Sequence, residues 1–119
     1  MNTKCIQDSD IIFTKGNTCY LKFQRIGADG NPILTKASKV YFTVKRYIDT
    51  DTVIFQKSLT DGTITFTEDG YYHFTINPAD TEKLELGNYW YDVEVQNDDY
   101  IFTPAKGNLI LTYEITNER

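Results

Sequence analysis

The chain has 119 residues, of which 14% are aromatic and 24% charged, and its formal net charge at pH 7 is −5. This composition excludes an intrinsically disordered chain, and the acidity, with 12 scattered basic residues, argues against nucleic acid as a partner. No segment approaches the roughly 20 consecutive apolar residues of a membrane-spanning helix, so we expect no membrane partner.

The N-terminus predicts a cytoplasmic start, because residues 1–5 (MNTKC) lack the charged region and apolar run of a secretory signal. For the two cysteines, Cys5 and Cys19, reduced and partly buried thiols are the favoured interpretation. A disulfide between a first strand and its neighbour stays open, since spacing alone does not decide it.

The first half of the chain alternates apolar and polar residues, the pattern of half-buried strands. Residues 27–32 (GADGNP) are dense in turn formers and predict a loop. In the segment after it, Val40, Phe42 and Val44 are expected in the core. Tyr41 then lies on a solvated face. The strands predicted here are residues 11–13, 19–24, 40–45 and 53–57.

The β pattern continues with two runs that predict a hairpin. Residues 64–66 and 71–76 alternate on either side of Asp69-Gly70, a common hairpin turn. His73 lies between core-facing aromatic residues, so we expect it on the opposite, solvent-facing side of its strand.

One segment carries a helical signal. Residues 77–84 (NPADTEKL) begin with Asn77, a good N-cap, followed by Pro78, which suits the first helical position. We expect one or two helical turns that cross from one sheet to the other.

Residues 84–95 (LELGNYWYDVEV) carry the most informative pattern of the chain. A glycine, a tyrosine two residues later and strict alternation are typical of the tyrosine corner in an immunoglobulin-like sandwich. Gly87 and Tyr89 are therefore predicted as structural residues of such a corner, with the Tyr89 hydroxyl bonded to the preceding backbone.

The last part of the chain predicts a hairpin. Residues 97–99 (NDD) form its turn, and residues 103–107 (TPAKG) are expected to interrupt the returning strand. From Leu109 to Ile115 every second residue is apolar, so we expect strand to the C-terminus.

Seven to nine short strands with one crossover helix predict an all-β fold, an immunoglobulin-like antiparallel β-sandwich. No linker, low-complexity tract or internal repeat divides residues 1–119, so we expect a single domain. Tyr91 stands where the immunoglobulin disulfide would place a cysteine. We expect tyrosine packing to replace that bridge.

No catalytic constellation stands out, so we expect no enzyme, no cofactor and no metal site. His73 is the only histidine, and two distant cysteines do not complete a zinc set. Asp92 and Glu94 lie about 7 Å apart on one strand face, and we expect them to point into solvent. Turn chemistry explains the paired acids better than loop-bound calcium, the weaker alternative. These pairs are Asp8 with Asp10, Asp49 with Asp51, Glu68 with Asp69, and Asp98 with Asp99.

Trp90 shares an outer face with Asp92 and Glu94 if its neighbouring tyrosines face the core. An exposed tryptophan anchors a protein interface or stacks on a sugar, whereas packing under a loop or the N-terminal segment is the equally weighted alternative. Tyr41 and His73 are candidates to join Trp90 in a binding interface, with the strand register left open.

The order of these features resembles small phage proteins, particularly the N-terminal module of the baseplate upper protein and similar tail-associated domains. Those phages infect low-GC Gram-positive bacteria. The segments that carry the resemblance are residues 16–18 (GNT), 29–33 (DGNPI), 40–44 (VYFTV), 71–74 (YYHF), 77–81 (NPADT), 87–93 (GNYWYDV) and 103–107 (TPAKG).

The resemblance implies a non-enzymatic virion or prophage component, present in the host cytoplasm during assembly and then in the virion. We expect a structural module that makes protein–protein contacts with other tail or baseplate proteins, with homo-oligomerisation left open. The alternative is a carbohydrate-binding or adhesive surface domain, because sandwiches also present aromatic platforms to sugars and fold alone does not separate the two.

Overall fold

The computed structural model describes residues 10–98, 100–113 and 115. Within them the chain forms strands that follow one another almost without helix. The strands are β1 (Ile11–Thr14), β2 (Cys19–Gln24), β3 (Lys39–Lys45), β4 (Phe55–Ser58), β5 (Ile64–Phe66), β6 (Tyr71–Ile76), β7 (Gly87–Asn97) and β8 (Tyr100–Thr112), and the helix is α1 (Pro78–Thr81).

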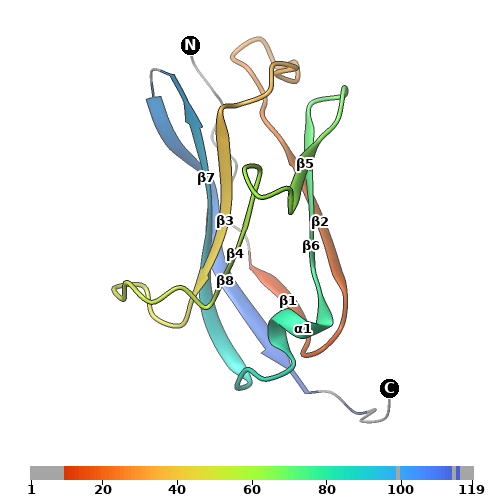
Figure 1. The fold of residues 1–119 in the computed structure, drawn as a ribbon, viewed down its shortest axis with the longest axis vertical. Helices are drawn as coiled ribbons and strands as arrows, with labels where there is room; N and C mark the ends of the chain where they lie inside the picture. Colours follow the sequence, from red (N-terminus) through yellow and green to blue (C-terminus); the bar gives the residue numbers. More distant parts are fainter. Residues whose placement is uncertain (1–9, 99, 114, 116–119) are drawn as a thin grey trace.

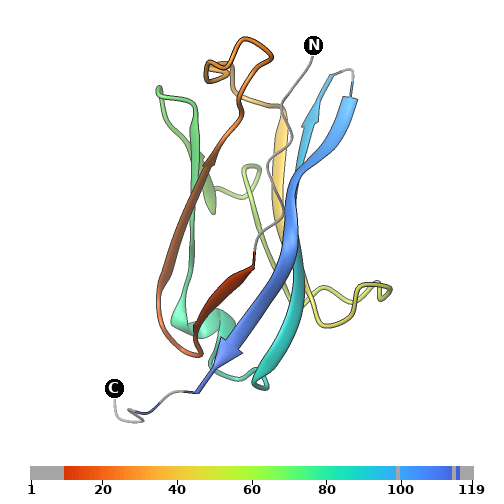
Figure 2. The ribbon, with the colours of Figure 1, turned by 180° about the vertical axis from the view of Figure 1, so that it is seen from behind.

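The strands form two sheets packed face to face (Figure 1). One sheet has five strands in the order β1-β8-β7-β3-β4, and the other has three in the order β2-β6-β5. Neighbouring strands are antiparallel except β1 and β8, which run parallel along one edge (Figure 2). The predicted immunoglobulin-like β-sandwich is confirmed, with one parallel edge strand added to its antiparallel pattern.

The core lies between the two sheets, where alternation points every second side chain inward. The ring of Phe42 in β3 lies 4.6 Å from that of Phe74 in the opposite sheet and 5.5 Å from that of Tyr91. The contact between Phe42 and Phe74 joins the two sheets, whereas Tyr91 lies in the same sheet as Phe42. Replacement of the disulfide by tyrosine packing stays a prediction. The buried apolar residues are Ala37, Val40, Phe42, Val44, Ile64, Tyr72, Phe74, Ile76, Tyr89, Tyr91, Val93, Val95, Leu109 and Leu111.

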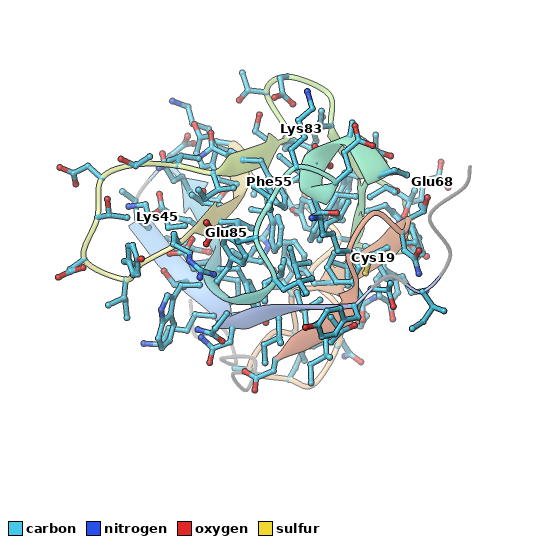
Figure 3. All side chains as sticks on the ribbon, turned by 90° about the horizontal axis from the view of Figure 1, so that it is seen from below. Cys19, Lys45, Phe55, Glu68, Lys83 and Glu85 are labelled. Atoms are coloured by element: carbon cyan, nitrogen blue, oxygen red, sulfur yellow. The ribbon has the colours of Figure 1, made fainter. Side chains whose placement is uncertain are left out.

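The predicted crossover helix is present as α1, which leads from β6 in one sheet to β7 in the other. The backbone N–H of Asn77 donates to the Asp80 carboxylate at 2.7 Å, which fixes the start of the helix. The same carboxylate accepts from Lys57 Nζ of β4 at 2.7 Å, an ion pair that is largely buried. Figure 3 shows the sandwich from this end, with Lys83 labelled just after the helix.

The tyrosine corner predicted at Gly87 and Tyr89 is also present. The Tyr89 hydroxyl donates to the Glu85 carbonyl oxygen at 2.9 Å. Gly87 has a φ of 118°, a conformation that side chains with a Cβ rarely adopt. The corner therefore depends on both residues, one for its hydrogen bond and one for its backbone conformation.

Three features of the strands differ from the sequence predictions by more than one residue. The expected interruption at residues 103–107 is wrong, because β8 runs unbroken from Tyr100 to Thr112. The register shifts between Val93 and Val95, and this irregularity accommodates the buried Pro104 without ending the strand.

The other two differences lie at strand ends. The expected strand to the C-terminus is wrong, because β8 ends at Thr112 and Tyr113 and Ile115 are 77% and 90% exposed. The segment predicted at residues 53–57 begins as strand only at Phe55. In both places the alternation of residue types extends further than the pairing of the backbone.

Candidate binding site

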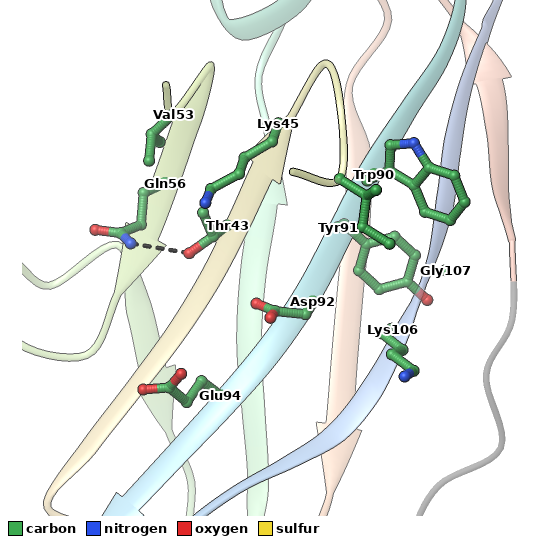
Figure 4. A pocket seen from close by; sticks show the side chains of 11 residues that line it. Thr43, Lys45, Val53, Gln56, Trp90, Tyr91, Asp92, Glu94, Lys106 and Gly107 are labelled. Carbon is green, nitrogen blue, oxygen red and sulfur yellow. Dashed lines mark hydrogen bonds between the residues drawn. The ribbon is translucent and has the colours of Figure 1, made fainter. Parts of the chain in front are cut away.

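The outer face of the five-stranded sheet carries a groove of about 550 Å³ (Figure 4). Its floor comes from β3, β4, β7 and β8, and the loop between β3 and β4 forms one wall. The lining residues are Thr43, Lys45, Ile48, Val53, Gln56, Trp90, Tyr91, Asp92, Glu94, Lys106 and Gly107.

The strand register places polar side chains in one row across the groove. Asp92 of β7 lies opposite Lys106 of β8 on one side and Thr43 of β3 on the other. Thr43 in turn lies opposite Gln56 of β4, whose Nε2 donates to the Thr43 hydroxyl at 2.8 Å. Trp90 belongs to the neighbouring row, where it lies opposite Lys45. The groove thus combines an aromatic ring with hydrogen-bond donors and acceptors of both charges.

Asp92 lies half-buried within this row. Loss of solvent contact raises the pKa of its carboxyl above the ordinary value, and the neighbouring Glu94 raises it further. Lys45 and Lys106 act in the opposite direction, but the net shift is upward. Asp92 therefore lies on the outer face of the sheet, as predicted, but it is half-buried there instead of fully solvated. A hydrogen-bond donor from a partner molecule would stabilise the charged form of this half-buried carboxylate.

The apolar part of the groove combines Trp90 with the β3–β4 loop. Trp90 is 36% exposed, and the loop residues Ile48 and Val53 are 71% and 44% exposed. Lys45 Nζ donates to the Thr50 carbonyl oxygen at 2.9 Å, which holds the loop beside the sheet. Trp90 therefore lies at the groove and keeps part of its ring accessible.

The three residues predicted as a binding interface do not share one surface. Tyr41 and Trp90 both lie on the outer face of the five-stranded sheet, where Tyr41 is opposite Glu94. His73 lies on the outer face of the other sheet, in β6. A single interface of Trp90, Tyr41 and His73 is therefore excluded, because two sheets and the core separate His73 from the other two.

His73 is also more constrained than a solvent-facing strand residue. Its Nδ1 contacts the Tyr20 hydroxyl, and its Nε2 lies 2.9 Å from the Thr67 hydroxyl. Its ring stacks on that of Tyr20, with the ring centres 5.9 Å apart. The sequence does not show these contacts, since they depend on how β2 and β6 pair.

Of the acidic pairs, Glu68 with Asp69 shows turn chemistry through Asp69. Asp69 accepts from the Tyr71 backbone N–H at 3.2 Å, and its hydrogen bond to Thr67 is the largest cause of a lowered pKa. In the part of the chain that the structure describes, no three His, Cys, Asp or Glu side chains gather to hold a metal ion. Asp8 and Asp99 lie outside the described residues.

The described part of the chain contains no helix long and apolar enough to cross a membrane. Cys19 is half-buried in β2, and burial raises the pKa of its thiol. Cys5, its candidate disulfide partner, lies outside the described residues.

Sequence reasoning missed several groove residues. Lys45 lies opposite Trp90, a position that follows from the register of β3 and β7. Lys106 lies within the predicted interruption at residues 103–107, Val53 lies at the start of a predicted strand, and Ile48 belongs to no predicted element. Alternation along a strand predicts which face of the sheet a residue lies on, but its neighbours on that face depend on how the strands pair.

No family model and no curated protein sequence matches this chain. Among solved structures, the chain is similar to the endo-β-1,4-mannanase from Thermotoga petrophila, with a TM-score of 0.58 and 14% identity over 96% of this chain. It covers 20% of the mannanase chain, so it spans about a fifth of that protein's length. This likeness shows the fold alone.

Another similar structure is Tim-4 in complex with phosphatidylserine. The match covers 89% of this chain and 98% of that one, at 14% identity and a TM-score of 0.37.

Proposed function

We propose that this domain is a non-enzymatic phage or prophage module that contacts other tail or baseplate proteins through the groove around Trp90. The observation that carries the proposal is the combination of partly exposed apolar side chains and charged groups on one sheet face. Trp90, Ile48 and Val53 supply the apolar part, and Asp92 and Lys106 supply charges of opposite sign.

This combination has the composition of a protein interface. Interfaces place a few aromatic or aliphatic anchors within a polar rim, and tryptophan is enriched among the residues that dominate binding. Clustered apolar side chains on a surface commonly mark a partner site. A partner that donates a hydrogen bond to Asp92 would also relieve the cost of its partial burial.

The non-enzymatic part of the proposal rests on the carboxylate geometry. Asp92 and Glu94 extend from one face of one strand, so they do not oppose each other across the groove (Figure 4). A glycosidase needs two carboxyl groups on opposite sides of the bond that it cleaves. The phage part of the proposal rests on the sequence resemblance described above.

The test is affinity capture from the source bacterium after prophage induction, with proteins identified by mass spectrometry. The wild-type domain should enrich tail or baseplate proteins, and Trp90→Ala should lose them while keeping its circular dichroism spectrum and thermal midpoint. Tyr113→Ala is the matched control, because Tyr113 is 77% exposed and lies outside the groove. That variant should capture the same proteins as wild type.

Two results would contradict the proposal. Retention of tail proteins by Trp90→Ala would remove the groove as the contact surface. Enrichment of envelope glycans, lost in Trp90→Ala, would instead support the carbohydrate-binding alternative at this groove.

A further inference from the structure

A second pocket, of about 340 Å³, lies on the other side of the sandwich, against the three-stranded sheet. It forms where β5 is shorter than β6. β5 begins at Ile64, which pairs with Phe74, so Thr75 and Ile76 of β6 pair only with β2. The lining residues are Tyr20, Lys57, Thr63, Thr65, His73, Phe74, Thr75 and Asn77.

Aromatic rings form one wall of this pocket. Tyr20 is 58% exposed, and its ring is stacked on that of His73 at an interplanar angle of 21°. His73 is fixed at both ring nitrogens, by the Tyr20 and Thr67 hydroxyls. Tyr71 continues the row, with its ring centre 6.1 Å from that of His73. The exposed face of Tyr20 is thus held in place by its neighbours.

The other walls carry neutral hydrogen-bonding groups. Among the described residues that line the pocket, Lys57 is the only lysine, arginine or carboxylate, and its Nζ is already paired with Asp80. The side-chain hydroxyls of Thr65 and Thr75 have no hydrogen-bond partner among the described residues. Both face the same space as Tyr20. The pocket therefore offers an aromatic face and free hydroxyls to a ligand, and the charge of Lys57 is already balanced by Asp80.

We propose that this pocket binds a neutral saccharide, with one sugar ring stacked on Tyr20 and its hydroxyls bonded to Thr65 and Thr75. A pyranose ring has an apolar C–H face and a rim of hydroxyls that both donate and accept, which is the complement of this surface. Aromatic faces carry negative partial charge and attract such C–H groups. The volume lies at the lower end of the range for small-molecule pockets, which suits one or two sugar rings.

A charged ligand fits this pocket poorly. A phosphate or carboxylate requires an unpaired cation, and the ion pair with Asp80 occupies Lys57. The groove around Trp90 differs, because it presents two lysines and two carboxylates. The two faces thus suit different partners, and the saccharide site goes beyond the proposed function of the groove.

The experiment is an NMR titration of the ¹⁵N-labelled full chain with four neutral probes: cellohexaose, mannohexaose, maltohexaose and chitohexaose. Probe concentrations of about 10 mM would nearly fill a site with a Kd of about 1 mM. At least one probe should shift the amide signals of Tyr20, Thr65, His73 and Thr75. Signals of Trp90 and its neighbours should stay in place.

Variants then locate the site. Tyr20→Ala should weaken binding at least about tenfold, and Thr75→Val, which keeps the shape of the side chain, should weaken it about threefold to tenfold. Trp90→Ala is the control on the opposite face and should bind as wild type. Thr75→Val also keeps the test decisive if Tyr20→Ala fails to fold.

Three results would overturn the proposal: no shift with any probe, shifts confined to the Trp90 groove, or binding that Trp90→Ala abolishes and Thr75→Val leaves intact. The capture experiment tests the groove around Trp90, and the titration tests the pocket around Tyr20. Failure of the proposed function and failure of the saccharide site can therefore be told apart.

Discussion

The guanidinium of Arg46 lies over the ring of Tyr89, with its central carbon 4.6 Å from the ring centre. Its Nη1 donates to the Asn88 carbonyl oxygen at 2.9 Å, and its Nη2 lies 3.8 Å from the Glu85 carboxylate. Arg46 therefore covers the tyrosine corner from the end of β3. The two elements that support the groove, β3 and β7, are joined at this point.

Replacement of Tyr89 by Phe tests the corner directly. The variant keeps the buried ring and loses the hydrogen bond to Glu85, so the free energy of unfolding should fall by about 1 kcal/mol. Urea denaturation measures the loss. Tyr113→Phe, at an exposed position, should change stability by less than about 0.5 kcal/mol. Equal effects of the two substitutions would show that the corner bond contributes nothing specific.

Alkaline pH should weaken the same corner. Burial, the largest cause, raises the pKa of the Tyr89 hydroxyl above its ordinary value, against the opposing effect of Arg46. A raised folded-state pKa gives stability that is fully present below the unfolded value of about 10 and is lost as pH rises through the folded value. The stability advantage of wild type over Tyr89→Phe should therefore shrink above about pH 10. A difference that stays constant into this range would refute the assignment.

Asp92→Asn should stabilise the domain at neutral pH. The folded-state pKa of Asp92 is raised, so its contribution is favourable below the unfolded value of about 3.9 and is lost as pH rises through the folded value. We expect a gain of about 0.5 kcal/mol near pH 7, small because solvent screens a half-exposed group. The gain should disappear below about pH 4.

The control for this prediction is Asp51→Asn, a change at an exposed carboxylate of the β3–β4 loop. Thermal unfolding at several pH values compares the two variants. A lower stability of Asp92→Asn at pH 7 would mean that attraction to Lys45 and Lys106 outweighs burial.

Arg25 offers a test of the buried polar interior. It is 1% exposed, and its Nη2 donates to the Thr35 carbonyl oxygen at 2.6 Å, but Nε and Nη1 have no hydrogen-bond partner among the residues that the structure describes. Because desolvation of a charge is costly, Arg25→Met should be within about 1 kcal/mol of wild type or more stable.

Arg25→Ala is the matched comparison, because it removes the charge and also leaves a cavity. It should lose about 2 kcal/mol or more in urea denaturation. If Arg25→Met loses as much as Arg25→Ala, the guanidinium stabilises the fold through its hydrogen bonds and the prediction is wrong.

Much of the fold could be predicted from local sequence because its determinants are local. Alternation placed Val40, Phe42 and Val44 inside, and all three are fully buried. Gly87 and Tyr89 predicted the corner, since its hydrogen bond spans only four residues. Pro104 misled the same reasoning, because a proline interrupts a strand unless a register shift accommodates it.

The candidate sites depended on long-range pairing and were harder to predict. Trp90 and His73 both lie on outer faces, as alternation indicates, but on different sheets. Asp92 meets Lys106 only because of the register between β7 and β8. Local alternation carries no signal for such pairings, so the composition of each surface emerges only with the structure.

The central claim is that the groove around Trp90 contacts a tail or baseplate protein. Photo-cross-linking in cells that produce the phage tests it most directly, with benzoylphenylalanine placed at Ile48 on the groove wall or at Lys22 on the opposite sheet. Ile48 is 71% exposed, so the substitution should not disturb the fold. The account predicts a cross-link to a tail or baseplate protein from position 48 and none from position 22. A cross-link to such a protein from position 22 alone, or none from position 48, would contradict it.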